Sequence, residues 1–137
     1  MRSIVSAGPT ADQDGVAVLT VVDDVSITVT DRVGTVCLIC AVGYTDTDVL
    51  ASTTTCRILR GGVPIASATS SRTTGAVDNL AASVLMFAVV EDVAVGETFT
   101  IDIDPSGSGV DVKADNCKLM AIGLSADAAL VPNFGSP

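Results

Sequence analysis

The sequence has 137 residues, of which 48% are hydrophobic and 17% are charged, a balance that indicates one folded domain and not a disordered chain. Its formal net charge of -9 argues against nucleic acid as a partner, because a phosphate backbone would repel it. Histidine is absent and aromatic residues make up only 3% of the chain, which excludes a Ser-His-Asp triad, a Cys-His pair and an aromatic platform for sugars or bases.

Runs rich in valine, threonine and isoleucine alternate with clusters of glycine, aspartate, serine and proline, the pattern of an all-β sandwich or barrel. In chain order the predicted strands are 15–22, 25–30, 35–44, 50–60, 63–70, 81–91, 97–104, 109–114 and 117–125. We predict a jelly-roll-like antiparallel β-sandwich of about eight strands over residues 15–125. Irregular arms at residues 1–14 and 126–137 are expected to flank it.

Local signals support several of these strands. In VSITVT, Val25, Ile27 and Val29 share one face, which is expected to be the inner one. Gly61-Gly62 predicts a two-residue hairpin turn, because both positions tolerate a positive φ. Residues 81–91 are predicted as a strand, although Asn79 could instead cap a helix there.

Three segments, VCLICAV, VLMFAVV and LMAIGL, are apolar on both faces. A two-layer sandwich has one interior, so each strand needs only one dry face, and contact between subunits would cover the other. We therefore predict a homo-oligomer. The candidate interface residues are Cys37, Ile39, Met86, Val90, Met120 and Ile122. The alternative is that small residues such as Ala41, Ala88 and Gly123 tolerate exposure.

The stretch GETFTIDIDPSGSGVDVKADN raises the question of a calcium site. In a strand, Phe99, Ile101 and Ile103 would share one face, and Asp102 and Asp104 would share the solvated one. Asp102, Asp104 and Asp111 are weak candidates for calcium ligands, but they do not match EF-hand spacing. A glycosidase pair would need an apolar pocket that raises one pKa, and threonines and a glycine-serine loop supply none. We expect a solvated hairpin, no catalytic residue and no cofactor.

The four cysteines do not suggest a zinc site. Cys37 and Cys40 lie three apart in a predicted strand and would point to opposite faces, while Cys56 and Cys117 form no second CxxC. They are expected to be thiols that pack as small hydrophobes in a reducing cytosol. The N-terminal segment has a single arginine and an apolar run too short for a signal peptide, and AASVLMFAVV is about half a membrane span, so no membrane association is expected.

The segments GTVCLICAVGY, STTTCRILRGGVPIASA, GETFTIDID and CKLMAIGLS carry a resemblance in pattern and order. The run from Val25 to Leu124 resembles the compact jelly roll of capsid decoration (cement) proteins of tailed bacteriophages. In outline it is also similar to the trimeric C1q/TNF-like sandwich.

That resemblance implies a viral structural protein that binds the outer capsid surface as a homotrimer and stabilises the head. Its partners would be itself and the major capsid protein, and it would be made in the host cytoplasm and reside on the virion. The N-terminal arm, with Arg2, Ile4 and Val5, would dock on the capsid. The alternative function is a receptor- or glycan-binding fibre tip, for which Tyr44 beside Asp46 and Asp48 is the one qualifying cluster. A small hydrolase is a third interpretation, for which the sequence offers no recognisable catalytic residues.

Overall fold

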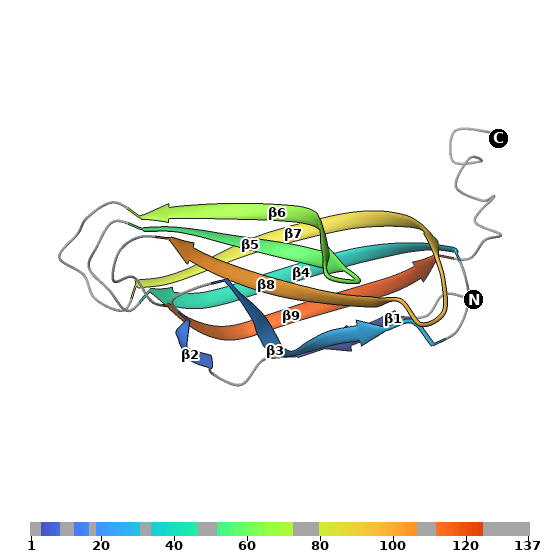
Figure 1. Cartoon of the computed structure of the whole chain (residues 1–137), viewed down its shortest axis with the longest axis horizontal. Helices are drawn as coiled ribbons and strands as arrows, with labels where there is room; N and C mark the ends of the chain where they lie inside the picture. The colour runs from blue at the N-terminus through green and yellow to red at the C-terminus, as the bar shows by residue number, and fades with distance from the viewer. Residues whose placement is uncertain are drawn as a thin grey trace, which may run out of the picture.

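A computed structural model describes residues 4–8, 13–16, 19–30, 34–46, 52–72, 80–106 and 112–124. Within these ranges the chain forms strands only (Figure 1). The strands are β1 (Ile4–Ala7), β2 (Gln13–Val16), β3 (Thr20–Thr28), β4 (Gly34–Asp46), β5 (Ser52–Arg60), β6 (Val63–Arg72), β7 (Leu80–Val93), β8 (Thr98–Ser106) and β9 (Val112–Leu124). Over these same ranges, no helix is present that is long and apolar enough to cross a membrane.

The strands form two antiparallel sheets that pack face to face (Figure 1). Sheet A has the order β1–β9–β4–β7, with β2 pairing with the same edge of β9 as β1, and sheet B has the order β3–β8–β5–β6. The connections that pass from one sheet to the other are those between β2 and β3, β3 and β4, β4 and β5, β6 and β7, β7 and β8, and β8 and β9. This arrangement is that of a jelly roll, and it confirms the predicted fold class.

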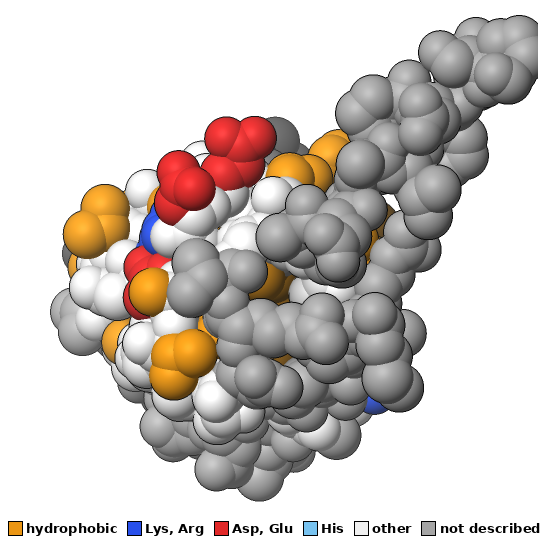
Figure 2. Space-filling model, turned by 90° about the vertical axis from the view of Figure 1, so that its right-hand side faces the viewer, with side chains coloured by type: hydrophobic (Ala, Val, Ile, Leu, Met, Phe, Trp, Pro, Cys, Tyr) orange, Lys and Arg blue, Asp and Glu red, His pale blue; other side chains and the backbone are white. Residues whose placement is uncertain are grey.

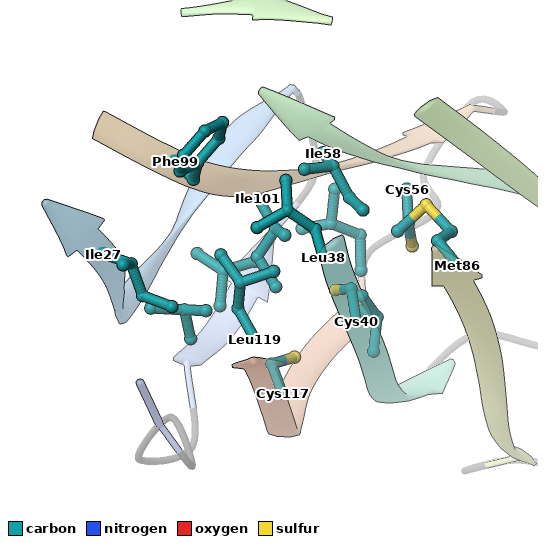
Figure 3. Packing of buried hydrophobic residues seen from close by; sticks show 14 of the residues in the cluster. Ile27, Leu38, Cys40, Cys56, Ile58, Met86, Phe99, Ile101, Cys117 and Leu119 are labelled. Atoms are coloured by element: carbon teal, nitrogen blue, oxygen red, sulfur yellow. The ribbon is translucent and has the colours of Figure 1, made fainter. Parts of the chain in front are cut away.

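The core lies between the two sheets. Figure 3 shows Ile58 and Ile101 of sheet B facing Leu38 and Leu119 of sheet A, and all four side chains are fully buried. The predicted inner faces are confirmed for Val25 and Ile27 of β3, and for Phe99, Ile101 and Ile103 of β8. Alternation therefore placed these side chains correctly, because each strand has one apolar and one polar face.

The N-terminal region differs from the irregular arm expected at residues 1–14. Residues 4–7 form β1, in which Ile4 lies opposite Ile122 and Ala7 lies opposite Leu119, and residues 13–16 form β2 beside β9. These short strands satisfy backbone groups along an edge of β9 that would otherwise be unpaired. The predicted C-terminal arm at 126–137 lies outside the described residues.

Two predicted strand boundaries are also wrong. The strands expected at 15–22 and 25–30 are replaced by β2 and a continuous β3, whose pairing with β8 shifts register between Val21 and Ser26. The strands expected at 109–114 and 117–125 are one strand, β9, with a shift opposite Ala41 and Gly43. Asn116 has a φ of 51°, and such a residue lets a strand bulge without ending it.

Other local predictions are confirmed. Gly61 and Gly62 form the turn between β5 and β6 with φ values of 55° and 83°. Residues 81–91 lie within β7, so the helical alternative is wrong.

Candidate interaction surfaces

Sheet A carries hydrophobic side chains on its outer face as well as on its inner one. Its three longest strands place them in register, because Ile39 of β4 lies between Phe87 of β7 and Met120 of β9. We call the whole set the apolar face: Leu85, Phe87 and Val89 of β7, Cys37, Ile39 and Ala41 of β4, and Met120 and Ile122 of β9. Polar residues begin only at its ends, with Lys118 opposite Ala41 and the exposed Glu91 after Val89.

The apolar face is most exposed along β7, which is an edge strand of sheet A. The exposed fractions are 70% for Leu85, 75% for Phe87 and 62% for Val89, and Ile39 on the neighbouring strand is 38% exposed. Soluble monomers rarely display a continuous apolar surface of this kind, and a long apolar edge strand is prone to pair with other chains. The apolar face is therefore the leading candidate for an interaction surface.

The predicted interface residues divide between the two faces of sheet A. Cys37, Ile39, Met120 and Ile122 lie on the outer face, as expected. Met86 and Val90 do not, since they are 4% and 7% exposed and pack in the core, so their assignment was wrong. Between residues 81 and 91 of β7 the exposed side chains are the odd-numbered ones. A prediction that is out of phase by one residue assigns every side chain of a strand to the wrong face.

The outer face of sheet B is mainly polar along β5 and β6. Thr53, Thr55 and Arg57 of β5 are partly exposed there, and the hydroxyls of Thr55 and Thr69 lie 3.1 Å apart in a hydrogen bond. Ser67 and Ser71 of β6 continue this surface. The two outer faces of the sandwich thus differ in chemistry. The outer face of sheet B is suited to contact with water, and that of sheet A is suited to contact with an apolar partner.

The proposed calcium ligands lie in a different environment from the one expected. Asp102 is only 3% exposed, and Arg57 donates hydrogen bonds from Nε to Oδ1 at 2.9 Å and from Nη2 to Oδ2 at 2.7 Å. This bidentate pair occupies both carboxylate oxygens, and the hydrogen bond to Asp102 raises the pKa of Arg57 above its ordinary value. Asp102 is thus not on a solvated surface, because an opposite charge on the adjacent strand compensates for its burial.

Asp104 is partly exposed on the same strand, and Asp111 lies outside the described residues. Among the residues that the structure places, no group of three or more histidine, cysteine, aspartate or glutamate side chains is arranged to bind a metal ion.

Three cysteines are buried in the core. Cys40 of β4, Cys56 of β5 and Cys117 of β9 are inaccessible, whereas Cys37 lies on the opposite face of β4 from Cys40, as predicted. Burial, together with nearby Cys117, raises the pKa of Cys40 and of Cys56 to about 12. The Cys117 thiol donates to the Gly43 carbonyl at 3.3 Å. Protonated buried thiols are poor nucleophiles, so Cys40 and Cys56 act as small hydrophobic side chains, as expected.

Arg60 fastens one end of the sandwich. Its guanidinium donates to both carboxylate oxygens of Glu97, at 2.7 and 3.0 Å, and to the carbonyls of Glu91 at 3.2 Å and Asp92 at 3.0 Å. Asp92 has a φ of 53°, at a register shift where β7 bulges. Since Arg60 ends β5 of sheet B and Glu91 and Asp92 end β7 of sheet A, these bonds join the two sheets. Sequence patterns gave no signal for this cluster, because Arg60 lies more than thirty residues before its acceptors.

The other residues that were expected to take part in binding lie in environments different from those expected, or outside the described residues. Tyr44 is 4% exposed and belongs to the core, so it is not the exposed aromatic on which the fibre-tip alternative rested. Ile4 and Val5 have backbones paired with β9, and Arg2 and Asp48 lie outside the described residues.

No protein-family model matches the sequence, and no curated protein matches it. Solved structures do match the fold. An Eiger TNF from S. frugiperda aligns with a TM-score of 0.61 and 12% identity over 89% of this chain and 93% of that chain. The dimeric latent PorU from Porphyromonas gingivalis aligns with a TM-score of 0.58 and 14% identity. The Gx strain of infectious bursal disease virus aligns with a TM-score of 0.57 and 8% identity.

These alignments cover different shares of their partners. They include 89% of this chain but 13% of the PorU chain, and 92% of this chain but 33% of the viral chain. The chain therefore spans the length of the TNF domain and a minor part of the other two proteins. At these identities the likeness defines the fold, which is a TNF-like jelly-roll sandwich that also occurs in a viral particle.

Proposed function

We propose that this chain is a non-catalytic structural protein of a virion, which binds the outer surface of a capsid as a homotrimer and stabilises the head. The observation that carries the proposal is the apolar face, which is continuous over β7, β4 and β9 on the outer side of sheet A. A domain of this kind has a surface for assembly, and the described residues offer no metal cluster or histidine-based acid-base pair for catalysis. The similarity to a chain of a virus particle supports a place in the virion.

Self-association follows from the position of the apolar face at a sheet edge. Leu85, Phe87 and Val89 reach that edge, so β7 of one copy can pack against the outer face of sheet A in the next. Contacts between two different parts of a surface close into rings when the rotation allows it. Three copies are proposed from the likeness to trimeric sandwiches, and the capsid protein is proposed as the second partner.

The location is proposed on the same basis. None of the four cysteines forms a disulfide, which fits synthesis in a reducing host cytoplasm followed by attachment to the capsid exterior.

The test is to add the purified chain to heads assembled without it and to measure the temperature at which the heads rupture. We expect binding and a higher rupture temperature, because a trimer that bridges capsid subunits resists their separation. A Phe87→Ser variant, which weakens self-association at an exposed site, should protect less. Heads that do not bind the wild-type chain would refute the proposal.

A further inference from the structure

A second exposed apolar surface lies at one end of the sandwich, apart from the apolar face. It comprises the hairpin at residues 60–63, the turn at 94–97 and the end of β7, and we call it the tip. Val63 is 63% exposed and Val95 is 56% exposed, at turns where polar residues are usual. Figure 2 looks onto this end and shows acidic side chains next to exposed hydrophobic ones.

The tip is held in one shape by hydrogen bonds. Gly61 donates to the Thr98 carbonyl at 2.9 Å, and Gly96 donates to the Val29 carbonyl at 2.7 Å. Glu97 accepts a further hydrogen bond from the Ala94 backbone, in addition to its pair with Arg60. The hairpin and the turn are therefore braced against each other and against β3. A surface that is ordered before binding loses little conformational entropy on binding, which favours affinity.

The charge of the tip is negative. Arg60 and Glu97 neutralise each other in their ion pair, and the exposed side chains of Glu91 and Asp92 remain beside them. A partner that complements the tip offers an apolar depression for the two valines and lysine or arginine side chains at its rim.

We propose that the tip is the surface that docks on the capsid protein, a step that rests on the proposed function. In a trimer with cyclic symmetry the three tips are equivalent and lie at the same height along the axis. If that axis runs along the sandwich, the three tips can contact one surface together. Three weak contacts made together hold far more strongly than one, provided that their spacing matches.

The first test compares matched valine and leucine variants for binding to heads assembled without the chain, measured by co-sedimentation. Val63→Ser combined with Val95→Ser should weaken binding by at least about tenfold, a loss typical of central interface residues. Leu19→Ser removes a side chain that is 50% exposed away from the tip and should bind as wild type does. All three changes are at exposed sites, so light scattering and thermal unfolding should show unchanged mass and stability.

Two results separate the tip from the wider proposal. If the wild-type chain binds heads and the double valine variant binds equally well, the tip is not the docking surface, while the proposed function stands. If the wild-type chain does not bind heads at all, both are refuted.

The charge argument has its own test. Binding of the wild-type chain should weaken as salt concentration rises, and Glu91→Gln combined with Asp92→Asn should reduce that dependence. Asparagine is chosen because it tolerates the positive φ at position 92. An unchanged salt dependence, or tighter binding by the neutral variant at low salt, would contradict a basic rim on the partner.

Discussion

Arg57 and Asp102 lie directly opposite each other on β5 and β8, and the Arg57 guanidinium donates hydrogen bonds to both carboxylate oxygens of Asp102. The aspartate side chain is 4% exposed and the arginine side chain is 28% exposed. The charge of the buried Asp102 carboxylate is therefore balanced by the guanidinium of Arg57.

Removing that partner should destabilise the fold more than removing both. We expect Arg57→Met to lower the free energy of unfolding, because Asp102 would remain buried and unpaired. Arg57→Met combined with Asp102→Leu should recover part of the loss. Urea unfolding of both variants tests this. A double variant less stable than the single one would show that the ion pair stabilises the fold by more than the free energy needed to bury the Asp102 carboxylate. Because Arg57 holds both oxygens of Asp102, addition of calcium or EDTA should leave the wild-type unfolding temperature unchanged.

Glu97 gives the fold a defined response to acid. Its hydrogen bonds to Arg60 and to the Ala94 backbone lower its pKa below the ordinary value of 4.5. A carboxylate with a lower pKa in the folded chain stabilises the fold above the unfolded value, and this contribution is lost as the pH falls through the folded value.

Glu97→Gln should therefore be less stable than wild type at pH 7, and the difference should shrink as the pH falls below 4.5. Unfolding midpoints measured between pH 7 and acid check this. Glu91→Gln removes a nearby exposed carboxylate and controls for the change in net charge. A difference between Glu97→Gln and wild type that grows in acid would contradict the role given to the ion pair.

Adjacent residues on β7 should respond in opposite ways to the same substitution. Phe87→Ser alters a side chain that is 75% exposed and should lower the solution mass without unfolding the protomer. Met86→Ser alters a side chain that is 4% exposed and should lower the free energy of unfolding by about 2–5 kcal/mol. Light scattering and urea unfolding separate the two effects. A wild-type chain that is monomeric at high concentration would rule out the apolar face as a self-association surface.

Gly8 and Gly96 form a matched pair for testing a close approach. Both have nearly the same φ, 96° and 95°, but a Cβ on Gly8 would collide with the Cys117 carbonyl, whereas a Cβ on Gly96 would meet nothing. Gly96→Ala should cost only the strain of its φ, about 1–2 kcal/mol, and Gly8→Ala should cost more. Equal losses in thermal unfolding would mean that β1 can move away from β9 without penalty.

Sequence patterns were sufficient where the information is local. Ile101 and Ile103 alternate with aspartates, and Gly61-Gly62 is a turn by its own chemistry, so both were predicted correctly. Patterns failed on β7, where both faces are apolar and alternation alone gives no phase. The pairing of Phe87 with Ile39 decides which residues face outward, and that pairing joins distant parts of the chain.

The environment of Asp102 could not be predicted either, because it depends on pairing between distant parts of the chain. Alternation placed Asp102 on the outer face of its strand, but only the adjacency of β5 and β8 brings Arg57 to it. Similarly, residues 4–7 are too few to show a strand pattern, and their pairing partner lies more than a hundred residues further on.

The place of β9 has a consequence for how the chain folds as it is made. This strand, at residues 112–124, separates β1 and β2 from β4, so β1 and β2 cannot pair with their neighbouring strand until β9, the last of the described strands, has been made. Pairing between such distant segments is slow and leaves strand edges exposed in the meantime. Nascent chains halted before β9 should therefore remain sensitive to protease, and protection should come in a single late step once residue 124 has emerged.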